Sequence, residues 1–300
     1  MHERRGSLDA LGLVLVTAIP LGMTYAMLGY AFTVTFRSSG VFNFGIGQVT
    51  IFGALIYISA SSVFGTWWGL IAAALANAVL GVVFYFGFLR LPEKMGSGVI
   101  EMIMITLGLG LVLQNLVPSL WGYLALPAPD LVHGVSTVGS ISIEHQRIAL
   151  IVVAALVLGA IFLFERTTLM GKALIAVGTD REGAIFSGID PRAIQAVAWS
   201  MSFAITALAG ALFTPLASAT MASAAGLAVN GFSAALIGGL GNTVGSFIGG
   251  LGMGLVAGLA GVYVSAQYAN SITFALVILF ILIRPAGIVG DIKTALGPRA

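Results

Sequence analysis

The sequence has very few charged residues and no cysteine. Only 8% of its 300 residues are Asp, Glu, Lys or Arg, whereas soluble domains usually carry about 25%. So few charges cannot cover a surface in water, and 59% of the residues are hydrophobic. The lack of cysteine excludes disulfides, thiolate metal sites and cysteine nucleophiles. A net charge of +2 is too small to indicate nucleic-acid binding. Composition therefore predicts one membrane domain over residues 1–300, without a soluble catalytic domain.

Long apolar runs predict an all-α, polytopic bundle of transmembrane helices. A helix needs about 20 mostly apolar residues to cross a bilayer. The segment 227–240 is short for a crossing, and it can instead be a tilted half-helix or a re-entrant segment. We therefore predict nine spans, or eight if this segment does not cross. The candidate spans are 10–34, 43–64, 67–89, 98–118, 147–164, 193–218, 227–240, 244–264 and 267–284.

The positions of lysine and arginine predict the orientation, because these residues gather in cytoplasmic loops. If the connection 165–192 is cytoplasmic and all nine segments cross, ten basic residues lie inside and only Arg4, Arg5 and Arg147 lie outside. If 227–240 does not cross, the C-terminal basic residues move outside, which the rule disfavours. The ten predicted inside are Arg37, Arg90, Lys94, Arg166, Lys172, Arg181, Arg192, Arg284, Lys293 and Arg299.

The connection 165–192 contains the signals of a short helix. The run Thr-Asp-Arg-Glu at 179–182 has the form of a capping box, in which Thr179 accepts a hydrogen bond from the backbone of Glu182. Gly188 is suited to end the helix in a left-handed conformation. The sequence therefore predicts a helix near 180–187, followed by a new helix that begins at Asp190 and Pro191.

A helix of this length is unstable alone and must dock on something. One interpretation is a lever that docks on a cytoplasmic partner, and the other is an ordinary helix at the membrane interface. Pattern alone leaves both open. The residues that we assign to docking are Thr179, Asp180, Arg181, Glu182, Ala184, Phe186 and Gly188.

Glycine is abundant, with 40 residues, and part of it is regularly spaced. Gly250, Gly254 and Gly258 repeat every four residues, as do Gly245 and Gly249. This spacing puts small residues on one helix face, where another backbone can approach closely. We expect packing within the chain rather than a subunit interface.

Two further glycine clusters lie beside an amide side chain and predict broken helices. One surrounds Asn43 and the other precedes Asn242. Unwound backbone at membrane depth is tolerated only inside protein or along a watery cavity. The segment 43–48 is therefore our candidate for the substrate pathway, and the alternative is a turn that only packs near the cytoplasmic edge. The polar candidates for the pathway are Asn43, Gln48, Glu101, Gln114 and Asn230.

Motifs along nearly the whole chain resemble, in the same order, those of one protein family. Residues 43–48 read Asn-Phe-Gly-Ile-Gly-Gln, residues 171–173 read Gly-Lys-Ala, residues 232–241 read Phe-Ser-Ala-Ala-Leu-Ile-Gly-Gly-Leu-Gly, and residues 284–290 read Arg-Pro-x-Gly-Ile-x-Gly. In this order they resemble the LivH-type permeases of branched-chain amino acid ABC transporters.

The chain lacks ionisable residues at three positions where motifs of that family have them. Ile46 and Gln48 stand where the motif Asn-Phe-Ala-His-Gly-Glu has His and Glu, and Asn230 stands where some relatives have Lys. Each change removes an ionisable group. The substrate therefore stays open among branched-chain amino acids, urea, short amides and other small polar solutes.

The resemblance implies a permease subunit in the plasma (inner) membrane of a prokaryote. It would pair with a second permease subunit, usually of the LivM type, with two cytoplasmic ATPases that dock on coupling helices, and with an extracytoplasmic substrate-binding protein. The sequence has no G-x-x-x-x-G-K-[ST] phosphate loop, so we expect no ATP hydrolysis by this chain and no cofactor.

The alternative is an ion-coupled secondary transporter. Such proteins usually need acidic or histidine relays at mid-membrane, and Glu101 stands nearly alone. A channel is disfavoured because no selectivity-filter sequence is present. An intramembrane enzyme is disfavoured because the spans contain no catalytic constellation, and the histidines, for example His133 and His145, are not spaced as metal ligands.

Overall fold

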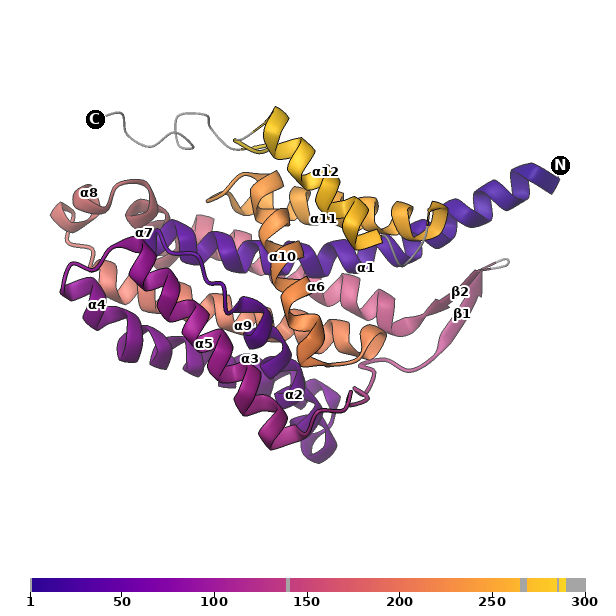
Figure 1. The fold of residues 1–300 in the computed structure, drawn as a ribbon, viewed down its shortest axis with the longest axis horizontal. Helices are drawn as coiled ribbons and strands as arrows, with labels where there is room; N and C mark the ends of the chain where they lie inside the picture. The colour runs from indigo at the N-terminus through magenta and orange to yellow at the C-terminus, as the bar shows by residue number, and fades with distance from the viewer. Residues whose placement is uncertain (1, 139–140, 265–268, 285, 290–300) are drawn as a thin grey trace.

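The computed structural model describes residues 2–138, 141–264, 269–284 and 286–289. Within them the chain is helical apart from its connections and one short hairpin (Figure 1), which confirms the predicted all-α membrane bundle. The elements are α1 (His2–Ser39), α2 (Ile46–Phe64), α3 (Thr66–Phe84), the π-helix η1 (Tyr85–Leu89), α4 (Arg90–Lys94), α5 (Val99–Trp121), β1 (Val135–Val138), β2 (Ile141–Glu144), α6 (His145–Thr167), α7 (Leu169–Thr179), α8 (Arg181–Phe186), α9 (Pro191–Ala217), α10 (Met221–Gly238), α11 (Thr243–Tyr263) and α12 (Ala269–Ile283).

Eight of the described helical stretches are long and apolar enough to cross a membrane. The doubtful segment 227–240 lies largely in α10, which is one of the eight. Among the nine predicted spans, the one with the shortest described helix is instead the last, α12, with 15 residues. Residues 267 and 268 at the start of the last predicted span lie outside the described residues, as do Pro285, Gly290, Lys293 and Arg299.

The bundle has two distinct ends (Figure 1). The antiparallel hairpin of β1 and β2 projects at one end, beside the start of α1, and α4 and α8 lie at the other. The last turn of α1, α4 and the connection between α6 and α9 carry most of the basic residues predicted inside, and they gather at the α8 end. Following that prediction, the α8 end is termed the inner end and the hairpin end the outer end.

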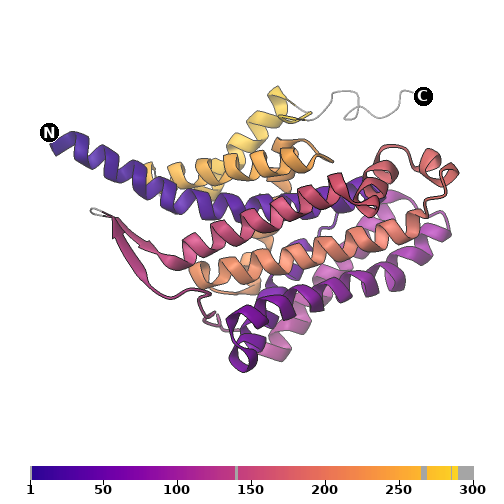
Figure 2. The ribbon, with the colours of Figure 1, turned by 180° about the vertical axis from the view of Figure 1, so that it is seen from behind.

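The central layer consists of long helices that run alongside α1. Figure 2 shows α6 next to α1, then α9, then α3, while α11 packs on the opposite side of α1. In Figure 1, α10 crosses α1 at a steep angle. The molecule therefore has one set of helices along its long axis and a second set that crosses it.

Glycines allow α11 to pack directly on α1. A Cβ added at Gly250 or Gly254 would overlap backbone atoms of Ala26 or Gly22. A Cβ at Gly258 would lie 2.6 Å from the Cβ of Ala18. These three glycines therefore pack within the chain, one helical turn apart.

Gly245 and Gly249 face α10 instead. A Cβ at either position would overlap the backbone of Gly238 or Ala234. Between α10 and α11 the backbone is not helical, and Asn242 caps α11 by accepting from Gly245 N at 2.9 Å. The predicted helix break at this glycine cluster is confirmed.

Candidate functional site

The predicted break around Asn43 is confirmed, because residues 40–45 separate α1 from α2. Gly40 leaves the helix with a positive φ of 69°. The Thr106 hydroxyl of α5 holds the break from outside: it accepts from Phe44 N at 3.2 Å and lies 3.1 Å from Phe42 O. The break that joins α1 to α2 is therefore also hydrogen-bonded to α5.

Two amide side chains at this break have unused polar groups. Asn43 is fully buried, and its Oδ1 accepts from Gly45 N at 3.1 Å. Within the described part of the chain, neither Asn43 Nδ2 nor Gln48 Oε1 has a hydrogen-bond partner. Gln48 Oε1 lies beside Gly110 of α5, 3.3 Å from where a Cβ would stand. The break thus contains one donor and one acceptor that are buried without a partner among the described residues.

The start of α2 is wedged between α5 and α10. A Cβ on Gly45 would lie 2.8 Å from Thr106 O, and one on Gly47 would overlap the carbonyl group of Ala224. Only glycine allows this approach. Gln48, which follows Gly47, is therefore held at the junction of α2, α5 and α10.

The other predicted pathway residues are not brought to this junction. Asn230 is buried on α10 and donates to the Tyr25 hydroxyl of α1 at 3.1 Å. Glu101 and Gln114 are exposed on α5. The structure therefore groups Asn43 with Gln48 and places the remaining three elsewhere.

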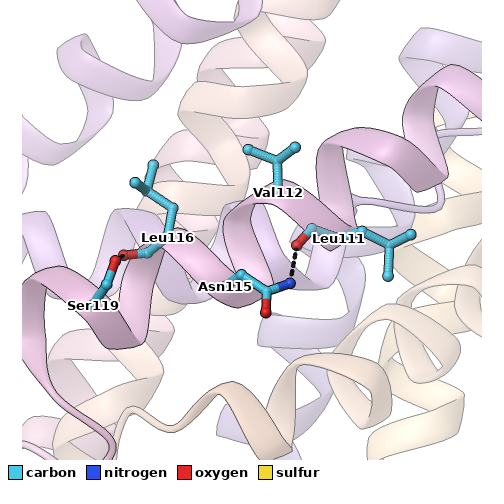
Figure 3. A pocket seen from close by; sticks show the side chains of 5 residues that line it. All are labelled: Leu111, Val112, Asn115, Leu116 and Ser119. Carbon is cyan, nitrogen blue, oxygen red and sulfur yellow. Dashed lines mark hydrogen bonds between the residues drawn. The ribbon is translucent and has the colours of Figure 1, made fainter.

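The outward face of α5 carries a shallow hollow of ≈ 560 Å³ (Figure 3). Asn115 Nδ2 donates to Leu111 O at 2.8 Å and Ser119 Oγ donates to Leu116 O at 2.7 Å, so both bonds stay within the helix. Gln114 lies next to Asn115 and is also exposed. This span thus presents amides to its surroundings.

Sequence reasoning missed an aromatic cluster around the break. The ring of Phe42 stacks on Phe36 with centroids 4.5 Å apart and meets Phe232 edge-on at 5.5 Å. Phe44 lies 6.0 Å from Phe232. The signal was the alternation Phe-Asn-Phe at 42–44, in which the rings flank the amide. A cluster of aromatic rings thus lies beside the unpaired polar groups.

The predicted short helix exists as α8, but its cap is not Thr179. Thr179 is the last residue of α7, and its hydroxyl donates to Ile175 O at 2.9 Å. Asp180 has the extended backbone of an N-cap, and its Oδ1 accepts from Gly183 N at 3.0 Å. The capping-box assignment was wrong because it did not foresee α7, which runs up to Thr179 and gives it a helical backbone.

The predicted end of α8 is confirmed. Gly188 has a φ of +80°, and Ile189 N donates to Ala184 O at 3.0 Å. Asp190 then caps α9 by accepting from Arg192 N at 3.0 Å, with Pro191 as the first helical residue. The helix is therefore delimited at both ends by side chains or glycine.

One side of α8 faces the bundle and the other faces outward. Ala184 is buried, whereas Phe186 is 90% exposed and Ile185 is exposed. Arg181 forms an ion pair with Glu93 of α4. An apolar side chain outside the bundle at the inner end is typical of a docking surface.

A buried ion pair at the inner end was also missed. Glu165, near the end of α6, pairs with Arg37 in the last turn of α1. The same carboxylate accepts from the Tyr30 hydroxyl at 3.0 Å and from the Thr243 hydroxyl at 2.6 Å. This cluster joins α1, α6 and α11. The residues of this cluster lie far apart in the sequence. Only the predicted orientation of the spans, which puts the end of α1 and the end of α6 on the same side of the membrane, could have indicated it.

The described residues contain no group of three or more His, Cys, Asp or Glu that could hold a metal ion.

Comparison with known proteins gives one consistent result. Residues 14–283 match the family described as "Branched-chain amino acid transport system / permease component". The chain is 30% identical over 289 residues to the high-affinity branched-chain amino acid transport system permease protein LivH of Escherichia coli K12, covering 91% of this chain and 93% of that protein.

Two more distant relatives agree. The permease protein BraD of the corresponding system in Pseudomonas aeruginosa is 28% identical, covering 92% of this chain and 94% of its own length. A probable LivH of Methanocaldococcus jannaschii is 25% identical, with 93% and 92% covered. Among solved structures none matches. The match to the family spans nearly all of the membrane bundle, and the chain belongs to the permease components of branched-chain amino acid transport systems.

Proposed function

We propose that this chain is the permease subunit of an ATP-driven importer for branched-chain amino acids or related small polar solutes. The observation that carries the proposal is α8, a helix capped at both ends whose Phe186 is 90% exposed at the inner end. Phe186 adjoins the exposed Ile185, and an exposed apolar patch favours a protein cover. Membership of the permease family supports this function over an ion-coupled secondary transporter.

The partners follow from this function. Two cytoplasmic ATPases dock at the inner ends of two permease subunits, this chain and a LivM-type partner, and a binding protein delivers the solute at the outer end. The assembly lies in the plasma (inner) membrane of a prokaryote. ATP hydrolysis takes place on the ATPases, and this chain transmits the resulting movement.

The pathway that we propose passes the break at residues 40–45. Asn43 Nδ2 and Gln48 Oε1 match the carboxylate and the ammonium group of an amino acid, and the neighbouring rings of Phe42, Phe44 and Phe232 match an apolar side chain. Buried polar groups without partners are costly in a membrane. A passing zwitterion would satisfy both.

The exposed face of α5 is the face that we assign to the second permease subunit. Gln114 and Asn115 would leave amide groups in hydrocarbon if lipid covered this face. A facing helix or a shared aqueous path supplies hydrogen-bond partners that lipid lacks. In this arrangement Gln114 lies along the pathway but does not contact Asn43. Glu101, in the first turn of α5, lies at the inner end of the pathway.

The docking role of α8 is tested with one pair of variants. Phe186→Ser should abolish co-purification of the ATPase subunits, while Tyr123→Ser, which removes an aromatic ring that is 89% exposed near the outer end, should not. Equal retention of the ATPases by both variants would contradict the docking surface.

Uptake into proteoliposomes tests the function itself. With the binding protein and both ATPases present, uptake should require ATP, and leucine, isoleucine, valine, urea and short amides should compete with different strengths. Uptake driven by an ion gradient without the ATPases would overturn the proposal.

A further inference from the structure

The connection 165–192, which contains α7 and α8, is linked to the last turn of α1 from two of its residues, Glu165 and Arg181. At its first residue, Glu165 pairs with Arg37. At α8, Arg181 starts a chain of contacts that ends on the carbonyl of Ser38. Arg37 and Ser38 are consecutive, and the helix break begins two residues later at Gly40. Two independent routes therefore converge just before the candidate pathway.

The second route crosses three elements. Arg181 pairs with Glu93 Oε1 on α4, and Glu93 Oε2 lies 3.2 Å from the Tyr85 hydroxyl. That hydroxyl donates to Gln195 Oε1 of α9 at 2.7 Å, and Gln195 Nε2 donates to Ser38 O at 3.2 Å. Gln195 is 1% exposed, so its bonds are not shared with water.

Among the described residues of this route, the Tyr85 hydroxyl is the one group that has two alternative hydrogen-bond acceptors. It carries one proton but faces two acceptors, Gln195 Oε1 and Glu93 Oε2. Tyr85 is also the first residue of the π-helix η1, and single π-turns inside helices are frequent at functional sites. The structure therefore gives this hydroxyl a nearer acceptor on α9, at 2.7 Å, and a second acceptor on α4, at 3.2 Å.

We propose that Tyr85 is a positioning residue that passes movement of α8 to the helix break at 40–45. The proposal rests on the docking role of α8 proposed above. While Arg181 neutralises Glu93, the Tyr85 proton stays on Gln195, and Gln195 holds Ser38. When an ATPase draws α8 and Arg181 away, the bare carboxylate of Glu93 becomes the stronger acceptor. The Tyr85 hydroxyl then turns to Glu93, and Gln195 is released from it.

The first route, the ion pair of Glu165 with Arg37, confines this movement to the residues after Arg37. Glu165 is held by Arg37, Tyr30 and Thr243 and is 4% exposed. Gly178 of α7 also packs on the stem of Arg37, with a Cβ position 3.1 Å from Arg37 Cδ. The end of α1 is thereby fixed to α6, α7 and α11. A change at Ser38 is transmitted forward to the break rather than backward along α1.

The test uses the complete transporter in proteoliposomes and the natural absence of cysteine from this chain. A single Ser39→Cys substitution places a reporter thiol next to Ser38, and its labelling rate by a maleimide is measured with and without ATP and vanadate. Uptake per ATP hydrolysed is measured in parallel. The variant is Tyr85→Phe, and the matched control is Tyr57→Phe, whose buried hydroxyl donates to Pro129 O at 2.7 Å near the outer end.

We expect Tyr85→Phe to hydrolyse ATP but to lose the nucleotide-dependent change in labelling. Its uptake per ATP should fall about threefold or more, the scale on which removing a link alters coupling between sites. The control should match the parent in both. If Tyr85→Phe keeps the labelling change and the uptake ratio, the relay is wrong.

The other outcomes also discriminate. If Tyr85→Phe does not fold, Glu93→Gln is measured instead, because it keeps the side-chain shape and removes the charge that draws the hydroxyl. A normal labelling change in that variant would overturn the relay. If the parent itself shows no ATP-driven uptake, the proposed function fails, and a labelling change that is still lost in Tyr85→Phe would support the relay alone.

Discussion

Two membrane helices of this chain, α1 and α5, contrast sharply in what surrounds them. The most apolar part of α1 is 72% buried inside the molecule, whereas that of α5 is only 17% buried. Yet α5 is no less apolar than α1. Hydropathy therefore shows that both helices can cross a membrane, and it does not show which of them has protein on all sides.

The face of α1 that meets α11 and the outward face of α5 differ in side-chain size. The α1 face includes Ala18, Gly22 and Ala26, where the two backbones approach each other. The outward face of α5 has large branched side chains such as Leu111, Val112 and Leu116. Because lipid is as apolar as leucine, small residues favour helix contacts within the membrane, and large ones are typical of a lipid-facing surface or a partner interface.

The largest expected effect comes from filling the small-residue face of α1. Gly254→Leu should prevent α11 from packing on α1, because even a Cβ there overlaps the backbone of Gly22. We expect a severe loss of folded protein, measured as the yield of monodisperse material in detergent. Gly252→Leu lies on the same helix with no atom within 4 Å of its Cβ position and should be tolerated. Equal yields from the two variants would contradict the packing of α11 on α1.

An intermediate effect on stability is expected from breaking the ion pair in the last turn of α1. Glu165→Gln leaves the Arg37 guanidinium buried without its counter-charge, which should cost about 3 kcal/mol. Thermal unfolding in detergent measures the loss. Glu101→Gln, at the exposed start of α5, should change the unfolding temperature little. A comparable loss in both variants would show that the two carboxylates have similar surroundings in the assembled protein.

The smallest effect on stability is expected on α5. Asn115→Leu removes only a bond to Leu111 O on its own helix and should shift the free energy of unfolding by less than about 0.5 kcal/mol. It should nevertheless weaken association with the second permease subunit, measured by co-purification. Unchanged association would indicate that lipid covers this face.

The sequence was sufficient for the features that depend on local chemistry. Apolar runs predicted the spans, and Gly188 and Asp190 predicted where α8 ends and α9 begins. Glycine clusters predicted the breaks before α2 and α11. These features follow from backbone conformations and bonds within a few residues, which a single sequence displays.

Features that depend on long-range neighbours were not predictable. The partners of Glu165 are Tyr30, Arg37 and Thr243, up to 135 residues away. Asn230 was grouped with Asn43 because both are polar, but it faces Tyr25. Thr179 was misassigned because a capping box and a helix C-terminus both accommodate threonine, and only the presence of α7 distinguishes them.

The packing of α1 on α11 also has a consequence for biosynthesis. A ribosome makes α1 more than 200 residues before α11. The groove of Ala18, Gly22 and Ala26 must therefore wait in the bilayer, without its glycine-rich partner, while the intervening spans are inserted one by one. The α11-facing side of α1 is therefore covered only late, after α6, α9 and α10 have been made. A nascent chain stalled before residue 243 should thus be inserted yet remain open to proteases and insertion chaperones.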